Sequence, residues 1–315
     1  MNSNDPVISW LLQGAPAVRW QVLRDLTSAP PHTVEQERQL VAEEGWGKRL
    51  LSYQESDGRW GGGLYSPKWT STTYTLLTLR QLGLPPEHPQ ALCACRLLLD
   101  KGLCDDGGIN FSPTNERSET CITGMVLSLL AYFRLEDESL HLIRDCLLNQ
   151  QLPDGGWNCR APRGARHSSF HTTILVLEGL REYQQAYRQK RETEKVQEAQ
   201  ARGREFLLVH RLFCSHRTGE VVNENMTRFS FPPRWHYDIL RALDYFRDCG
   251  SDWDPRLAEA IDIVRARRKA DGRWRLQNHH PGKEFFLLEE LGKPSRTNTL
   301  RALRVLRWSE GIYCK

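Results

Sequence analysis

The chain repeats one short phrase, and a repeat restricts the fold to a small set of architectures. Asp-Gly, one variable residue and then an aromatic or large apolar residue occur at 57–60, 106–109, 154–157 and 271–274. Asp-Gly forms tight turns, because glycine adopts positive φ at no steric cost and Asp bonds to its own backbone. Recurrence of the phrase indicates units that bury their apolar faces against one another. We expect Trp60, Trp157 and Trp274, which end the phrase, to be structural.

A second phrase, a short polar segment followed by a Leu-rich run, comes after most of these turns. It begins near residues 71, 119, 171, 236 and 296, and the stretch 19–23 fits the same frame, which makes six starts. Polar residues suit a helix N-terminus, and an apolar run without strict alternation favours a helix over a strand. The amphipathic stretches 140–148 and 257–267 predict outer helices that cover these inner ones.

We therefore expect an all-α fold of six helical-hairpin repeats in one domain over residues 1–315, with a charged helical insertion around 182–204. Six pairs can close into an α/α toroid around a central, largely apolar cavity. The same pairs can also stack as an open solenoid, and the periodicity alone does not force closure.

The fullest form of the phrase, Gln151 followed by Asp154-Gly155-Gly156-Trp157, resembles the QW-type repeat of the terpenoid cyclase and protein prenyltransferase β-subunit superfamily. The resemblance spans roughly residues 14–308 and implies the closed toroid. Because this superfamily hosts several chemistries, the resemblance constrains the fold more than the reaction.

A sharper resemblance concerns metal binding. Protein prenyltransferase β subunits carry Asp-x-Cys at one inner-helix start and His before Thr at the next, and these residues bind zinc. The sequence is similar at Glu119-Thr120-Cys121 and at His171-Thr172, with Glu in place of Asp. The resemblance implies a Zn²⁺ ion held by Glu119, Cys121 and His171, with a fourth position open for catalysis. The alternative is structural: Cys121 as a small core residue and His171 as a hydrogen-bonded one.

Further candidates lie at or just before the helix starts. We expect His236, Asp238 and Tyr237 to exchange protons with a substrate, although Asp238 would equally serve as a helix cap. Candidate substrate-binding residues are Arg117, Arg296, Asn298, Trp69, Trp235, Phe170 and His167.

By this resemblance we expect a zinc-dependent, prenyltransferase-like enzyme, a transferase or hydrolase acting on a hydrophobic, isoprenoid-like substrate. Two alternatives stay open. One is a class II terpenoid cyclase related to squalene–hopene cyclases, which would need a non-standard catalytic acid because the Asp-x-Asp-Asp motif is missing. The other is a non-catalytic lipid-binding toroid.

Composition argues against two kinds of partner. The 43 basic and 39 acidic residues are interspersed, whereas nucleic-acid binding favours a concentrated basic stripe. No apolar run reaches the roughly 18–20 residues that a membrane-spanning helix needs, and the N-terminus lacks the layout of a signal peptide. We expect a cytoplasmic protein, in which nine scattered cysteines stay largely unpaired. The sequence leaves a partner subunit open.

Overall fold

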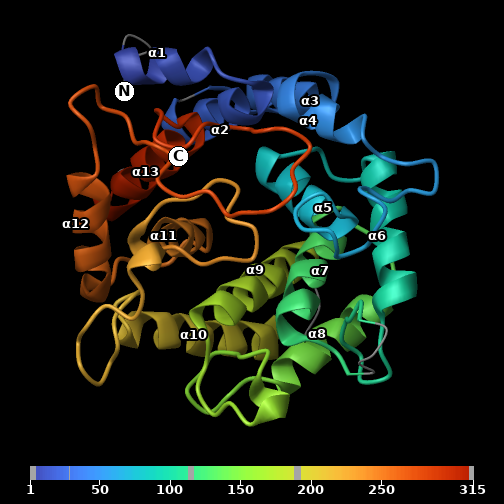
Figure 1. The fold of residues 1–315 in the computed structure, drawn as a ribbon. Coiled ribbons are helices and arrows are strands. Elements are labelled where there is room, and N and C mark those ends of the chain that lie inside the picture. The colour runs from blue at the N-terminus through green and yellow to red at the C-terminus, as the bar shows by residue number, and fades with distance from the viewer. Residues whose placement is uncertain (1–4, 28, 113–116, 188–192, 312–315) are drawn as a thin grey trace.

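The computed structural model describes residues 5–27, 29–112, 117–187 and 193–311, and these residues form thirteen α-helices joined by turns and loops (Figure 1). The helices are α1 (Pro6–Leu12), α2 (Pro16–Leu26), α3 (Pro31–Glu43), α4 (Gly45–Leu51), α5 (Thr72–Leu82), α6 (Pro89–Gly102), α7 (Thr120–Tyr132), α8 (Ser139–Asn149), α9 (Phe170–Ala186), α10 (Thr193–Val209), α11 (Ile239–Asp248), α12 (Ala258–Ala266) and α13 (Arg296–Ser309). Over the described residues the only β-type pairings are isolated bridges. The prediction of an all-α fold is confirmed.

The polar segments start helices because they satisfy the free N–H groups of the first turn. The Asp238 carboxylate accepts a hydrogen bond from the backbone N–H of Arg241 at the start of α11. The Ser295 hydroxyl does the same for Asn298 in α13. Such caps fix where a helix begins. Helices α5, α7, α9, α11 and α13 accordingly begin at or within three residues of the predicted positions.

The three tryptophans of the repeated phrase occupy equivalent, fully buried positions. Each indole N–H donates to the carbonyl ten residues earlier, where the preceding helix ends. The pairs are Trp60 to Leu50 (2.8 Å), Trp157 to Leu147 (2.7 Å) and Trp274 to Val264 (2.8 Å). A buried indole needs such a partner for its N–H. The contacts support the structural role expected for these residues.

A threonine hydroxyl in the first turn of the following helix completes each unit. The backbone N–H of the phrase's last residue donates to it in all four repeats. The pairs are Trp60 to Thr72 (3.1 Å), Ile109 to Thr123 (2.9 Å), Trp157 to Thr173 (3.0 Å) and Trp274 to Thr299 (3.0 Å). The phrase and the helix start are therefore two parts of one hydrogen-bonded unit.

Neighbouring helices pack closely. Helices α7 and α9 approach at paired glycines: a Cβ on Gly179 would lie 2.5 Å from the carbonyl oxygen of Gly124. The last helix, α13, packs against α2 as well as α11, so segments from opposite ends of the chain lie side by side (Figure 1). Apolar residues from Val7 to Trp308 form one contiguous core.

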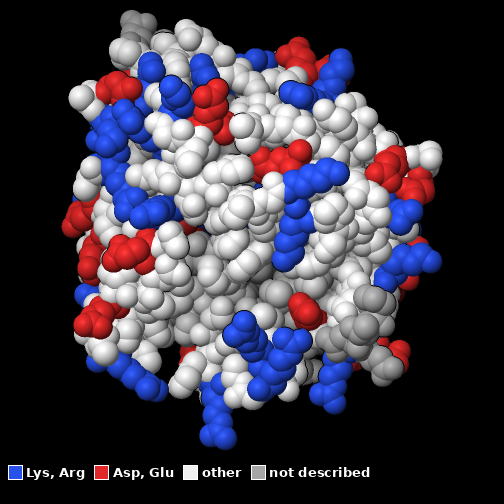
Figure 2. Space-filling model, in the orientation of Figure 1, with Lys and Arg blue, Asp and Glu red and all other residues white. Residues whose placement is uncertain are grey.

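The charged stretch 182–204 contributes to two of these helices. It comprises the end of α9 and most of α10, and α10 packs against α8 and α9. Residues 188–192 of the stretch lie outside the described residues, as does Cys314. Within the described segments, none of the helices combines the length and apolar character needed to cross a bilayer. Basic and acidic side chains are interspersed on the face that Figure 2 shows.

Candidate functional site

A cavity of about 530 Å³ lies among α2, α5, α7, α9, α11 and α13, and each of these six helices contributes to its wall. Eight arginines and four acidic residues line it. They are Arg24, Arg38, Arg80, Arg134, Arg181, Arg241, Arg301 and Arg304, with Glu178, Glu182, Asp244 and Asp248. The expectation of a largely apolar cavity is wrong for this one, because the helices turn charged side chains toward it.

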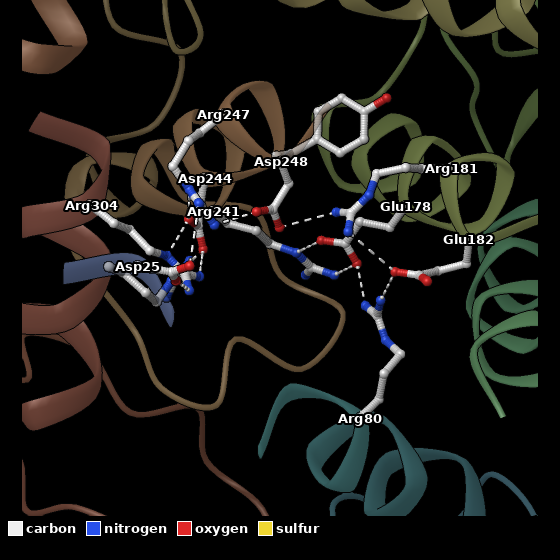
Figure 3. Close-up of polar contacts among 12 residues, drawn as sticks. Asp25, Arg80, Glu178, Arg181, Glu182, Arg241, Asp244, Arg247, Asp248 and Arg304 are labelled. Atoms are coloured by element: carbon white, nitrogen blue, oxygen red, sulfur yellow. Dashed lines mark hydrogen bonds and ion pairs between the residues drawn. The ribbon is translucent and has the colours of Figure 1, made fainter. Parts of the chain in front are cut away.

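Glu178 of α9 lies at the centre of one half of the charge network (Figure 3). Arg241 of α11 donates two hydrogen bonds to its carboxylate, of 2.7 and 2.8 Å, and Arg80 of α5 donates a third of 3.1 Å. Arg80 also reaches Glu182 at 3.0 Å. Burial alone would raise the pKa of Glu178, but the arginines, Arg241 first, lower it to about 2. Glu178 is therefore ionised at neutral pH.

The other half joins α2, α11 and α13. Arg304 donates to Asp244 from two nitrogens, and to Asp25 of α2 at 3.0 Å. Arg247 contacts Asp244 at 3.3 Å and also pairs with Asp248. Burial works to raise the pKa of Asp25, yet the hydrogen bond from Arg24, followed by the charges of Arg24 and Arg304, lowers it to about 2. These carboxylates hold the guanidinium groups in fixed positions.

Positive charge remains in excess after this pairing. Nine arginines contribute positive charge, namely the eight in the lining and Arg247. Seven acidic residues oppose them, namely the four in the lining and their neighbours Asp25, Glu35 and Glu87. Arginine does not lose its proton in proteins, so the excess is permanent. The Nε groups of Arg80 and Arg181 are also buried without a hydrogen-bond partner among the described residues. Buried donors and net positive charge together favour an anion in the cavity.

The predicted zinc ligands lie elsewhere, at the N-terminal ends of the inner helices. Glu119 immediately precedes α7, and Cys121 is half-buried in its first turn. His171 lies in the first turn of α9, where its Nδ1 accepts a hydrogen bond of 2.9 Å from the backbone N–H of Tyr237. No three His, Cys, Asp or Glu side chains in the part of the chain that the structure describes are grouped so as to hold a metal ion. The assignment of a zinc ion to Glu119, Cys121 and His171 therefore stays a prediction.

Cys121 has a different neighbour, Cys159 of the loop between α8 and α9. The Cys159 backbone N–H donates to the Thr172 hydroxyl at 3.4 Å. The neighbouring Cys121 thiol, more than Thr172, lowers the pKa of Cys159 to about 6. The Cys159 side chain, together with burial, raises the pKa of Cys121. Sequence analysis did not single out these two cysteines together, because 37 residues lie between them.

The three predicted acid–base residues surround the start of α11. His236 stacks between Trp235 and His280, with 3.7 Å between ring centroids on each side. Burial, and then the neighbouring His280 and His171, lower the pKa of His236 to about 3, so it is neutral at pH 7. The Tyr237 hydroxyl donates to a backbone carbonyl at 2.7 Å. Asp238 caps the helix and accepts a hydrogen bond of 2.8 Å from a serine hydroxyl.

The predicted substrate-binding residues do not line the cavity. Trp69 is buried, and its indole donates to the His280 carbonyl at 3.0 Å. Trp235 contacts the His171 ring, Phe170 packs on Phe206, and Arg296 lies over Trp10. Asn298 is buried and donates to the Phe229 carbonyl at 3.3 Å, whereas Arg117 and His167 are exposed.

Sequence analysis missed the cavity arginines. One signal was available in the sequence: Arg80, Arg241 and Arg304 each lie in a Leu-rich run whose other residues predict a buried helix. A buried arginine requires a carboxylate or an anionic ligand.

Comparison with known proteins adds little to this picture. No protein-family model matches the chain, and no curated protein matches it. Among solved structures, a protein from Actinoplanes is similar, with 15% sequence identity over 94% of this chain and 90% of that one and a TM-score of 0.46. We therefore infer function from the geometry of the cavity alone.

Proposed function

We propose that the chain is an α/α toroid whose central cavity binds a compact polyanion, such as a phosphorylated or polycarboxylic small molecule. The observation that carries the proposal is the set of eight arginines that line one cavity. A volume of about 530 Å³ falls within the range that small-molecule sites occupy.

Two contacts support the ring. All six helices that follow the polar starts reach the same cavity, which an open solenoid would not bring about. The last of them, α13, packs against the first, α2, and Arg304 bonds directly to Asp25 across that boundary. In a closed ring each inner helix has an inner neighbour on both sides.

The residue type indicates phosphate or carboxylate groups. Every basic side chain in the lining is arginine, whose planar fork of donors matches these anions in pairs. Among the described residues Arg301 makes two long contacts, 3.5 Å to Asp244 and 3.4 Å to the Ser230 carbonyl. Its guanidinium group therefore retains donors for a ligand.

Aromatic side chains share the cavity with the arginines. Trp20, Tyr132, Phe231 and Tyr245 also line it. A ligand with an anionic head and an apolar tail would contact both the arginines and the aromatic side chains. An isoprenoid-like substrate that carries an anionic group would therefore suit this cavity. A zinc-dependent transferase or hydrolase acting on such a ligand stays a prediction.

Binding of inorganic pyrophosphate to the full chain, measured by titration calorimetry and by thermal shift, tests the proposal. We expect saturable binding and a raised Tm, with sodium chloride at matched ionic strength as the control for screening. Arg80→Gln and Arg24→Gln should each weaken binding, on the order of tenfold or more. Arg24 is partly exposed, with 44% of its side chain accessible, so that variant should fold.

Arg265→Gln is the matched control, because Arg265 lies on the outer helix α12 in an exposed pair with Asp262. Equal binding by the wild type and both cavity variants would place the anion elsewhere. Failure of pyrophosphate, inorganic phosphate and citrate to bind at all would overturn the proposal.

A further inference from the structure

A second cavity, of about 620 Å³, lies beside the cavity that the eight arginines line (the arginine cavity). Its wall comes from the C-terminal half of α9, from α10 and from the end of α11. Three residues belong to the walls of both cavities, namely Arg181, Gln185 and Asp248. The two cavities are therefore adjacent, and one ligand can extend from the first into the second.

The boundary between the two cavities consists of polar side chains. Arg181 donates a hydrogen bond of 3.1 Å to Asp248, and the two side chains face each other in Figure 3. They keep 19% and 27% of their surface accessible, and Gln185, the third boundary residue, is exposed. A ligand that crosses this boundary meets hydrogen-bonding groups rather than packed apolar core.

The formal charge of the second cavity differs from that of the arginine cavity. Two arginines and three acidic residues line the second cavity, against eight arginines and four acidic residues in the first. Among the described residues its lining thus carries no positive excess, so it offers a second phosphate or carboxylate group no electrostatic stabilisation. The anionic part of a ligand belongs among the eight arginines, and an uncharged part belongs in the second cavity.

Amide side chains are the most numerous kind in the second cavity. They are those of Gln184, Gln185, Gln197 and Gln200. An amide presents both donors and an acceptor, and a hydroxyl group also does both, so amides pair well with a ligand rich in hydroxyl groups. None of the described lining residues is aromatic, so an apolar tail would bury little apolar surface here.

One of these amides is fixed by hydrogen bonds. Gln200 is only 2% exposed, its nitrogen donates to the Gln184 carbonyl oxygen at 2.7 Å, and its own carbonyl oxygen accepts from the Tyr245 hydroxyl at 3.3 Å. Tyr245 also lines the arginine cavity, so this chain of bonds runs from one cavity to the other. The Gln184 carbonyl oxygen is held in this way, whereas its nitrogen donates to none of the described residues. Gln184 therefore has both N–H donors available for a ligand.

We propose that the second cavity binds the uncharged, hydroxyl-rich part of a ligand whose anionic group lies among the arginines, so that the ligand is a sugar phosphate or another phosphorylated polyol. This ligand class, which rests on the proposed anion site, differs from an isoprenoid phosphate in what lies beyond the anionic group. Hydroxyl groups exchange hydrogen bonds with the glutamines, whereas an apolar chain would leave these amides without partners.

Titration calorimetry of the full chain tests the proposal with ligands that each carry one phosphate group. Glucose-6-phosphate, ribose-5-phosphate and myo-inositol-1-phosphate have hydroxyl groups beyond the phosphate, whereas hexyl phosphate has an apolar chain. We expect at least one of the hydroxyl-rich ligands to bind about tenfold more tightly than hexyl phosphate, because hydrogen bonds to the amides add to the contacts of the phosphate. Hexyl phosphate that binds as tightly as all three would overturn the proposal.

Pyrophosphate is the reference that separates this proposal from the anion site on which it rests. Pyrophosphate binding without any preference for the hydroxyl-rich ligands would reject the ligand class and leave the anion site intact. Failure of pyrophosphate and of all four phosphate esters to bind would reject both.

Two variants, Gln184→Leu and Gln197→Leu, each remove one amide from the second cavity. Neither residue lines the arginine cavity, so both variants should lose much of the preference for the hydroxyl-rich ligand while pyrophosphate binding stays unchanged. Gln197 is exposed, so that variant should fold even if loss of the bond to Gln200 destabilises Gln184→Leu. Gln36→Leu is the control, because Gln36 is exposed on α3 and lines neither cavity, and it should keep the preference. A preference that survives in both cavity variants would place the hydroxyl groups elsewhere and overturn the proposal.

Discussion

Arg304 in the last helix donates a hydrogen bond of 3.0 Å to the carboxylate of Asp25 in the second helix, across 279 residues of sequence. The same guanidinium group bonds to Asp244 of α11, so three helices meet at one side chain. Both Arg304 and Asp25 are almost fully buried. This contact ties the two ends of the chain to each other and to the cavity wall.

Replacement of Arg304 should therefore be costly. Arg304→Met preserves much of the side-chain volume, but it leaves Asp244 without the arginine that donates to it from two nitrogens and Asp25 with Arg24 as its main partner. Breaking a buried pair in this way costs about 3–5 kcal/mol, and urea denaturation should show that loss in the free energy of unfolding. Arg265→Met, which removes an exposed pair with Asp262, should change it by less than about 1 kcal/mol. Similar losses in both variants would contradict the assigned role.

The Glu178 carboxylate predicts a specific pH dependence of stability. Its pKa falls from the ordinary value of 4.5 to about 2 in the folded protein, so the folded state favours the ionised form. The resulting stabilisation is present above about pH 4.5 and is lost as the pH falls toward 2. A shift of this size corresponds to roughly 3 kcal/mol.

Denaturation of wild type and Glu178→Gln between pH 7 and pH 2 checks this prediction. The pKa of Asp25 is also lowered in the folded protein. The informative quantity is therefore the difference in the free energy of unfolding between wild type and Glu178→Gln, rather than either value alone. That difference should shrink as the pH drops through the window of about 4.5 to 2. A difference that stays constant with pH would show that Glu178 does not titrate there.

The equivalent tryptophans predict a graded loss of stability. Trp157→Ala removes a fully buried indole and its bond to the Leu147 carbonyl, and should cost about 3–5 kcal/mol. Trp157→Phe keeps an aromatic ring and should cost less, on the order of 1–3 kcal/mol for the unpaired carbonyl and lost volume. Trp253→Ala, at an exposed position, is the control. A different order of the three denaturation midpoints would contradict the structural role of the tryptophan in the repeated phrase.

The helices were predictable from sequence because their signals are local. A polar cap or an Asp-Gly turn acts within a few residues, so the starts of α5, α7, α9 and α13 fall within one residue of the predicted positions. Helix α2 begins earlier than expected, at Pro16 rather than near Arg19, because proline suits the first position of a helix.

The cavity was not predictable in the same way. Arg80, Arg241 and Arg304 lie on three helices far apart in the sequence, and each reads locally as a basic residue in a helix. Only the rotation of each helix about its axis decides whether its arginine faces solvent or the other charges. The residues that the resemblance to prenyltransferases implies lie at the helix starts, whereas the cavity arginines lie farther along the helices.

The zinc prediction for Glu119, Cys121 and His171 has a direct test in metal content. If the prediction holds, protein purified without chelator contains about one zinc ion per chain, and both Cys121→Ala and His171→Ala lose it while remaining folded. Cys93→Ala should retain it, because Cys93 is an exposed residue of α6 and not one of the predicted ligands. In the structure the His171 Nδ1 accepts a hydrogen bond from the Tyr237 backbone N–H. A chain that carries no zinc after reconstitution, or that keeps zinc in both variants, would rule out this ligand set.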